Sequence, residues 1–343
     1  MKTLETLAFD NRYAQLPAPL FSRLAPTGLA RPHLVAFNSD AAALIDLDPA
    51  EAMRPEFARY FGGQQLLPGS APLAMKYTGH QFGSYNPELG DGRGLLLGEV
   101  MNGRGEHIDL HLKGAGQTPY SRFGDGRAVL RSCIREYLGS EAMHGLGIPT
   151  TRALCIIGSD EPVQREKTET AAMLLRMADT HIRFGHFEWL FHSGQHELLK
   201  AFTDKVIAWH FPAITASATP YRDFFAEVSR RTASLMAKWQ LAGFAHGVMN
   251  TDNFSITGTT FDYGPYGFLD AYAPGFICNH SDHSGRYAWN QQPSIGLWNL
   301  NALAHALSGL IARDDLVAIL QDYEPQLVRV YAEGLRAKLG LLQ

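Results

Sequence analysis

The sequence has little cysteine and no excess of positive charge. Its 343 residues include three cysteines, Cys133, Cys155 and Cys278, which lie far apart and form no Cys-x-x-Cys pair. This spacing argues against a disulfide framework and a thiolate zinc site, and it indicates a reducing compartment. Thirty basic and thirty-four acidic residues give a formal charge of −4, whereas nucleic-acid and membrane-surface binders usually carry a basic excess. We therefore expect neither nucleic acid nor a membrane as a partner.

Long hydrophobic runs are also absent from the sequence. The first 25 residues contain no apolar run of the kind found in a secretion signal, and no stretch of about 18 apolar residues occurs that would span a membrane. These absences predict a cytoplasmic protein. The hydrophobic content of 45% is nevertheless sufficient for more than one core. Because single cores stop growing near ~250–300 residues, the length favours two lobes.

The distribution of proline, glycine and apolar residues divides the chain into three parts. Residues 1–75 are rich in proline, which predicts an extension packed on the rest of the protein. Residues 76–185 combine glycine-rich loops with strand and helix patterns and predict a small mixed lobe, whereas residues 186–343 predict a larger helical lobe. The sequence ends inside an apparent amphipathic helix, so we expect the natural protein to continue beyond residue 343.

A predicted strand and a predicted helix of the small lobe each carry one charged residue of a kinase-type pair. Apolar and polar residues alternate over residues 107–113, as in a strand with one buried face, and Lys113 falls on the polar face. The helical pattern that follows carries Glu136. Kinases hold phosphates with a lysine–glutamate pair on such elements, so we expect an ion pair here. The alternative interpretation makes each residue a solvated surface charge.

Residues 244–264 resemble the catalytic and metal-binding loops of kinase-type phosphotransferases. His246 sets the register, and Asn253 lies seven residues later, where these enzymes have a metal-binding asparagine. After a predicted hairpin of residues 254–261, Asp262 opens an Asp-Tyr-Gly triplet in place of Asp-Phe-Gly. These loops therefore predict a nucleotide-dependent metal site.

The position of the usual catalytic aspartate in these loops is occupied by Val248. A conventional kinase mechanism is compromised by this change, because the aspartate normally orients the acceptor hydroxyl. Asp252 is the nearest carboxylate that could replace it. The alternative interpretation is that Asp252 and Asn253 are only turn-forming residues, for which Asp and Asn are favoured.

Two glycine-containing loops and two arginines supply further candidate phosphate ligands. Glycines flank Arg93 in the first loop, and the second loop places Asp125 and Gly126 ahead of the helix. Backbone amides in such loops can approach phosphate closely, although ordinary hairpin turns would also explain the glycines. Arg176 and Arg183 lie where an ordinary kinase needs no arginine. Arginine suits bidentate phosphate recognition, and surface salt bridges are the alternative.

Four runs of the sequence together resemble the selenoprotein O family. They are KYTGHQFGSYNPELGDGRGLLLGEV, LKGAGQTPYSRFGDGRAVLRSCIREYL, HGVMNTDNFSITGTTFDYGPYGFLD and NQQPSIGLWNLNALA. The resemblance implies an α+β, protein-kinase-like bilobal fold, with an antiparallel sheet in a small N-lobe and a larger helical C-lobe. It also implies protein adenylylation, in which ATP is bound inverted relative to kinases, AMP passes to Ser, Thr or Tyr hydroxyl groups of protein substrates, and pyrophosphate is released.

The resemblance also implies roles for individual residues. Asp252 would be the proton acceptor, and Asn253 and Asp262 would bind Mg²⁺, with Mn²⁺ as the alternative ion. Members of the family usually continue beyond the end of this chain to a selenocysteine or cysteine near the C-terminus. The nucleotide-binding residues would be Gly90, Gly92, Arg93, Lys113, Asp125, Gly126, Glu136, Arg176, Arg183 and Asp262.

Three functions remain open on the residues alone: an AMP-transferring enzyme, a kinase with a displaced catalytic aspartate, and a nucleotide-binding pseudokinase scaffold. Val248 argues against the kinase. Lys113, Asn253 and Asp262 argue against the scaffold, because a scaffold does not need metal ligands. We expect a monomeric enzyme that takes ATP as a substrate and acts on other proteins.

Overall fold

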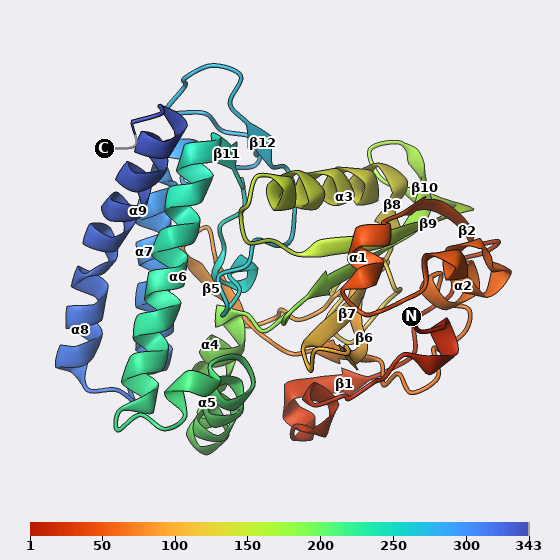
Figure 1. Ribbon diagram of the computed structural model, residues 1–343, viewed down its shortest axis with the longest axis horizontal. Helices are drawn as coiled ribbons and strands as arrows, with labels where there is room; N and C mark the ends of the chain where they lie inside the picture. Colours follow the sequence, from red (N-terminus) through yellow and green to blue (C-terminus); the bar gives the residue numbers. More distant parts are fainter. Residues whose placement is uncertain (342–343) are drawn as a thin grey trace. The chain divides into compact units, whose positions relative to one another are not determined.

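The computed structural model describes residues 1–341 and contains two compact units (Figure 1). Unit 1 consists of Met1–Tyr77, Glu88–His144 and Thr150–His181. Unit 2 consists of Thr78–Pro87, Gly145–Pro149 and the described residues from Ile182 onward. Within residues 1–341, no helix is both long enough and apolar enough to cross a membrane.

Unit 1 is built on a sheet in which all strand pairs are antiparallel. The strand order is β1-β3-β6-β7-β10-β9-β2, and β8 pairs with β10. The strands are β1 (Phe21–Arg23), β2 (His33–Phe37), β3 (Leu73–Met75), β6 (Gly94–Met101), β7 (His107–Lys113), β8 (Ala128–Val129), β9 (Arg152–Gln164) and β10 (Thr168–Ala178).

The register of β7 against β10 places the predicted phosphate ligands on one face of this sheet. Lys113 lies opposite Leu174, and His111 lies opposite Arg176. Residues opposite each other share a face, as do alternate residues of one strand. Lys113 and Arg176 therefore project from the same face, on neighbouring strands.

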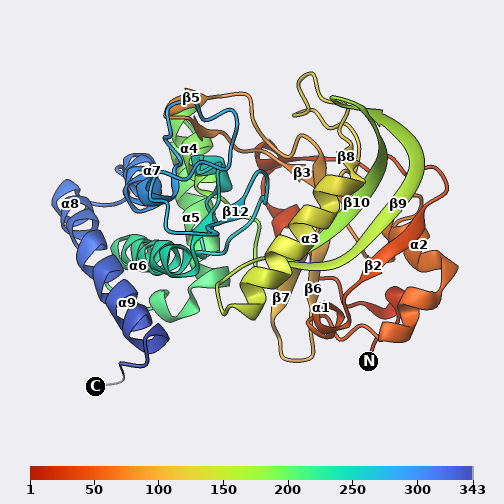
Figure 2. The same cartoon turned by 90° about the horizontal axis from the view of Figure 1, so that it is seen from above.

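Helix α3 (Leu130–Gly145) covers that face, as Figure 2 shows. Its Cys133 packs in a cluster with Ile156 and Leu174 of the sheet. The opposite face is covered by apolar residues of the N-terminal region, among them Phe57 and Phe61. The helices of that region are η1 (Leu4–Thr6), η2 (Tyr13–Gln15), η3 (Ala18–Leu20), α1 (Ser39–Ala43), η4 (Pro49–Met53) and α2 (Pro55–Phe61).

The prediction that strand β7 has only one buried face is wrong. Every residue from Asp109 to Lys113 is buried, including the polar ones. The Asp109 carboxylate accepts a hydrogen bond from the His181 backbone N–H at 2.7 Å, and Nε2 of His111 lies 3.2 Å from the Asp91 carboxylate. The rings of His111 and His181 stack with centroids 4.6 Å apart. Polar residues alternate along this strand because it has a buried polar layer, not because one face is solvated.

Unit 2 is mainly helical. Its longest helix, α6, begins with Pro220 at a position where the missing N–H costs nothing, and it ends at Gly243, whose φ of 65° suits a left-handed cap. The helices are α4 (Phe184–His192), α5 (His196–His210), η5 (Pro212–Ile214), α6 (Pro220–Ala242), η6 (Thr251–Asn253), η7 (Trp289–Gln291), α7 (Gln292–Ala306), α8 (Arg313–Gln321) and α9 (Tyr323–Lys338).

Two small antiparallel sheets complete unit 2. Strand β4 (Gly79–Gln81) pairs with β5 (Ser84–Asn86), and β11 (Phe244–Ala245) pairs with β12 (Gly267–Phe268). An antiparallel sheet with its helix in one unit and mainly helices in the other make an α+β fold. This confirms the predicted fold class and is consistent with a protein-kinase-like architecture.

Residues 254–261 do not form the predicted hairpin. Instead, the Phe184 N–H donates to the Phe254 carbonyl at 2.9 Å, and the Ile256 N–H donates to the Ile182 carbonyl at 3.0 Å. The segment thus pairs with the residues that lead into α4. A sequence pattern cannot distinguish this long-range pairing from a local hairpin, because both need the same extended backbone.

Candidate active site

Glu136 of α3 holds two cations of the neighbouring strands. Lys113 at the end of β7 donates to its carboxylate, and Arg176 of β10 donates to both carboxylate oxygens, from Nη2 to Oε2 at 3.1 Å. Lys113, Glu136 and Arg176 are 4%, 1% and 5% exposed. The ion pair predicted between Lys113 and Glu136 is therefore present, and Arg176 is a third member of the cluster.

The charged groups around Lys113 act on its pKa. Two cations share one carboxylate, and Arg93 is near enough to affect Lys113 electrostatically. Burial lowers the pKa of Lys113, Glu136 opposes this effect, and Arg176 and Arg93 add to it. Ammonium and guanidinium groups donate charge-assisted hydrogen bonds to phosphate oxygens. The cluster is therefore suited to binding phosphate oxygens.

The first glycine loop is held tightly against the chain that follows Lys113. A Cβ atom at Gly90 would lie 2.5 Å from Cγ of Tyr120, and one at Gly92 would lie 2.8 Å from the Tyr120 carbonyl oxygen. The Arg93 carbonyl accepts a hydrogen bond from the Gly114 N–H at 2.6 Å. Glycine is thus required at positions 90 and 92 because a second loop packs directly against them.

The second glycine loop places Asp125 in a surface ion pair. Arg165 donates to the Asp125 carboxylate at 2.7 Å, and this bond lowers the pKa of Asp125. The backbone N–H of Arg127 donates to the same carboxylate at 2.9 Å. Gly126 has a φ of 71°, and its close approach to the Gly116 backbone leaves no space for a side chain. The structure therefore groups Asp125 with Arg165 rather than with Glu136.

In unit 2, Arg183 joins two acidic residues of the predicted catalytic loops. Its Nη1 donates to the backbone carbonyl of Asp252 at 2.6 Å and to the Asp262 carboxylate. The guanidinium group also lies over the Phe261 ring, 4.5 Å from its centroid. Arg183 is nearly fully buried, so it fixes the loop of Asp252 relative to that of Asp262. This connection was not part of its predicted phosphate-binding role.

His246 and Asn253 stabilise the same loop from within. The His246 ring nitrogen Nε2 lies 2.9 Å from the Phe261 carbonyl, and the ring stacks on Trp239 with centroids 5.3 Å apart. The Asn253 amide nitrogen donates to the Val248 carbonyl at 2.9 Å. This bond orients the amide of Asn253 through its nitrogen, and the amide oxygen can act as an acceptor.

Asp252 combines burial with an unused oxygen. Its Oδ1 is buried and has no hydrogen-bond partner among residues 1–341, while its Oδ2 lies 3.4 Å from the amide nitrogen of Gln81. Burial raises the pKa of Asp252 to about 7; Arg183 counteracts this effect and Asp262 adds to it. A carboxylate with a pKa near neutrality can accept and release a proton at physiological pH.

Comparison with known proteins identifies the group of proteins to which this site belongs. The family model described as "Protein adenylyltransferase SelO" matches residues 3–343. The chain belongs to the SelO family. It is 58% identical to the "Protein nucleotidyltransferase YdiU" of Aliivibrio salmonicida over 345 residues, an alignment that covers 100% of this chain and 70% of that protein. It is 58% identical to the protein of the same name from Myxococcus xanthus over 341 residues, covering 99% of this chain and 70% of the relative.

SelO membership confirms the resemblance found in the sequence. The family description denotes adenylyl transfer to protein, and the names of the relatives denote nucleotidyl transfer to protein. The chain is therefore assigned to the enzymes that transfer a nucleotide to protein substrates.

Three residues that contact Asp252 or the first glycine loop were not predicted to have a role. Gln81 contacts the Asp252 carboxylate, and a Cβ atom at Gly79 would lie 3.0 Å from Asp252 Oδ1. Tyr120 packs against the first glycine loop. All three lie in the runs that carried the family resemblance. No local periodicity marks them, because their contacts are with residues distant in sequence.

Proposed function

We propose that this chain transfers AMP from ATP to Ser, Thr or Tyr hydroxyl groups of proteins and releases pyrophosphate, with the nucleotide bound inverted relative to kinases. The observation that carries this proposal is Asp252. Its buried carboxylate has an unpartnered oxygen and a pKa of about 7, and Val248 occupies the usual position of the kinase base. We assign Asp252 as the group that accepts the proton of the attacking hydroxyl.

The cations of unit 1 supply phosphate binding in this proposal. Lys113 and Arg176 bind triphosphate oxygens, and Glu136 fixes the orientation of both side chains. Arg93 adds charge to the cluster, and the glycine residues of the two loops allow backbone amides to approach the nucleotide. Positive charge preorganised at the far phosphates stabilises the departing pyrophosphate, which favours attack at the α-phosphorus. We assign Gly90, Gly92, Asp125 and Gly126 to the same nucleotide site.

Arg183 has two roles in the proposal. Its bonds to Asp262 and to the Asp252 backbone make it the residue that orients the catalytic loop. Its charge also contributes to the stabilisation of the phosphates. Loss of Arg183 is therefore expected to impair both nucleotide binding and the transfer step.

The donors of unit 2 fit Mg²⁺, or Mn²⁺ as the alternative. Hard cations of this kind prefer oxygen ligands, and the Asn253 amide is already oriented by its bond to Val248. Asn253 and Asp262 would hold the ion. Through this ion, Asp262 would also interact with the nucleotide. When bound, such an ion neutralises charge on the phosphates. Because the protein supplies only two oxygen ligands, we expect binding of the ion together with ATP and not before it.

The cysteines bear on the cellular compartment of the protein. No disulfide joins Cys133, Cys155 and Cys278 within residues 1–341, in keeping with our proposal of a reducing, cytoplasmic location. We further propose that the chain acts as a monomer on protein substrates.

Transfer of isotopic label tests the proposed reaction. The protein is incubated with Mg²⁺ and a protein substrate, and with ATP labelled either at the α-phosphate or at the γ-phosphate. Label is expected in protein only from the α-position, and Asp252→Asn is expected to abolish its transfer while ATP still binds. Label that enters only from the γ-position would identify a kinase instead. Label from neither position would favour the pseudokinase scaffold.

A further inference from the structure

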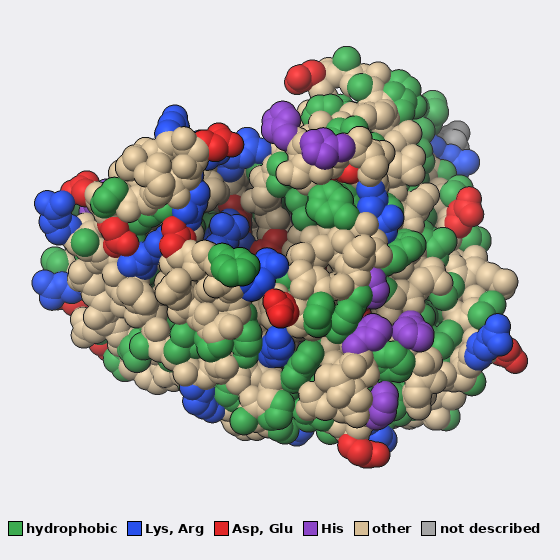
Figure 3. Space-filling model, turned by 180° about the vertical axis from the view of Figure 1, so that it is seen from behind, with side chains coloured by type: hydrophobic (Ala, Val, Ile, Leu, Met, Phe, Trp, Pro, Cys, Tyr) green, Lys and Arg blue, Asp and Glu red, His purple; other side chains and the backbone are tan. Residues whose placement is uncertain are grey.

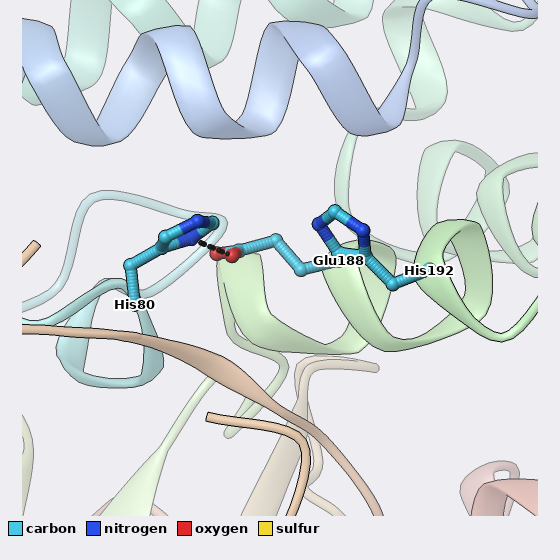
Figure 4. Close-up of side chains that lie close together, drawn as sticks. All are labelled: His80, Glu188 and His192. Carbon is cyan, nitrogen blue, oxygen red and sulfur yellow. Dashed lines mark hydrogen bonds and ion pairs between the residues drawn. The ribbon is translucent and has the colours of Figure 1, made fainter. Parts of the chain in front are cut away.

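Two histidines and a glutamate form a compact cluster in unit 2 that has no role in the proposed transfer reaction. They are His80 of β4 and the pair Glu188 and His192 of α4, each of which offers one ligand atom within 4.8 Å of the others. Glu188 and His192 are four residues apart on one helix and therefore share a face. Figure 4 shows the Glu188 side chain reaching toward the His80 ring, with the His192 ring on the same side of α4. Figure 3 shows histidine side chains in two separate groups on the face that it draws.

The buried carboxylate of Glu188 is the feature that requires an explanation. Glu188 is 0% exposed. One of its oxygens, Oε2, lies 2.5 Å from Nδ1 of His80, whereas Oε1 is buried and has no hydrogen-bond partner among residues 1–341. A fully buried carboxylate oxygen without a partner is costly, and native proteins compensate such groups with a cation or a donor. The open oxygen of Glu188 is therefore available to a cation or a hydrogen-bond donor.

The surrounding residues hold the two imidazole rings in place. The His80 ring lies 5.2 Å from that of Trp298, and the His192 ring lies 4.2 Å from that of Tyr85. These contacts restrict the rings to orientations near Glu188. His192 is also exposed, so water can reach the cluster from its side.

We propose that His80, Glu188 and His192 bind one Zn²⁺ ion, with water as the fourth ligand. Two imidazole nitrogens and one carboxylate oxygen are a ligand set that Zn²⁺ accepts in a tetrahedral site. Mg²⁺ and Ca²⁺ prefer oxygen ligands and do not fit two histidines. With bonds of ~2.0–2.1 Å, ligand atoms on a tetrahedral ion lie roughly 3.3 Å apart. The gap between His80 Nδ1 and Glu188 Oε2 therefore has to widen slightly when the ion enters.

Zinc at this position would fix strand β4 beside the catalytic loop. The His80 backbone N–H donates to the Thr251 hydroxyl at 2.7 Å, and Gln81 reaches the Asp252 carboxylate. The Phe82 N–H donates to the Tyr287 hydroxyl at 2.8 Å. A metal bridge from β4 to α4 therefore restrains the backbone next to Asp252. The ion takes no part in the transfer reaction, because none of the three ligands contacts the predicted reacting groups.

Zinc titration of the full chain tests the proposal without nucleotide. The protein is freed of metal with a chelator and titrated with ZnCl₂ by calorimetry, and with Co²⁺ as a spectroscopic probe. One equivalent of Zn²⁺ is expected to bind, and Co²⁺ is expected to give the intense visible absorption of a tetrahedral site. Bound Zn²⁺ should also raise the melting temperature.

Two ligand variants and two controls make the outcome specific. Glu188→Gln and His192→Ala are each expected to lose more than ~10-fold in Zn²⁺ affinity; His192 is exposed, so its variant is expected to fold. The two controls are His196→Ala and Asn253→Ala. His196 is an exposed histidine at the start of α5, and Asn253 lies at the proposed magnesium site. Both variants should bind Zn²⁺ as the unmodified chain does. Absence of zinc binding, or unchanged affinity in His192→Ala, would overturn the proposal. Neither result bears on AMP transfer, because no nucleotide is present.

Discussion

Replacing Glu136 by glutamine removes the negative charge that Lys113 and Arg176 share. All three side chains are buried, and the carboxylate accepts hydrogen bonds from both cations. Glutamine has nearly the same shape and can still accept one hydrogen bond. The substitution therefore removes one negative charge from the cluster, with little change in packing.

The expected loss of stability follows from burial. Removing one partner of a buried ion pair typically costs about 3–5 kcal/mol, because it leaves an uncompensated charge in the interior. Here two cations lose the same partner, so we expect Glu136→Gln to lower the free energy of unfolding of unit 1 by at least about 3 kcal/mol. The pKa of Lys113 should fall further, since Glu136 is the main group that raises it. Weaker ATP binding should accompany the loss of the carboxylate that orients both cations.

Hydrogen exchange in increasing urea measures the change in the correct unit. All five tryptophans belong to unit 2, so their fluorescence does not report on unit 1, whereas exchange of the β7 and β10 amides does. Glu169→Gln is the matched control, because Glu169 of β10 also pairs with an arginine of α3, Arg131, which is exposed. We expect no measurable change in this control. A loss below ~1 kcal/mol in Glu136→Gln, similar to an exposed pair, would refute the reasoning from burial.

Three further predictions address the transfer step, the first glycine loop and the thiols. Asp252→Asn should lower kcat for AMP transfer by ~10²-fold or more while the Kd for ATP changes little. Rapid-quench measurements give kcat and calorimetry gives the Kd. Equal losses in transfer rate and in ATP affinity would contradict the role of Asp252 as the base. Gly90→Ala should lower the melting temperature, because its Cβ would meet Tyr120 and its φ is 144°, and Tyr120→Ala should recover part of the loss. Burial raises the pKa of Cys133 to about 11, so a thiol reagent at pH 7.5 should label Cys278 in the native protein, and peptide mapping that finds labelled Cys133 would disprove this.

The sequence predicts the local elements of the phosphate cluster well. The alternation of apolar and polar residues predicts the strand of Lys113, and the helical spacing of apolar residues predicts the helix of Glu136. The structure contains the ion pair between them. The sequence resemblance places Arg176 at the same nucleotide site, but its bond to Glu136 could not be predicted, since that bond depends on the register of β10 against β7. The buried polar layer of β7 was also missed. Alternation of polar and apolar residues is the same whether solvent or another polar group meets the polar face.

In the catalytic loops, too, the sequence does not predict contacts between residues that are far apart along the chain. The spacing of His246, Asn253 and Asp262 marked the loops, whereas the bond from Arg183 to Asp262 joins residues that are 79 positions apart. The proposed zinc ligands extend this point, because His80 and Glu188 are separated by 108 positions. No short motif contains such a pair. Only the folded chain brings the Glu188 carboxylate, one oxygen of which has no hydrogen-bond partner among residues 1–341, next to two imidazole rings.

The assignment of Thr78–Pro87 to unit 2 has a consequence for how this protein folds during synthesis. These ten residues, which form the β4–β5 hairpin, leave the ribosome before most of unit 1, yet the residues they pair with in η6 and α4 follow more than 100 positions later. An isolated two-stranded hairpin is marginally stable at best, so this segment must remain unfolded until the catalytic loop has been made. Unit 1 can complete its sheet in the meantime, but unit 2 cannot begin with its own first segment. No single cut of the chain therefore yields two fragments that each contain a complete unit.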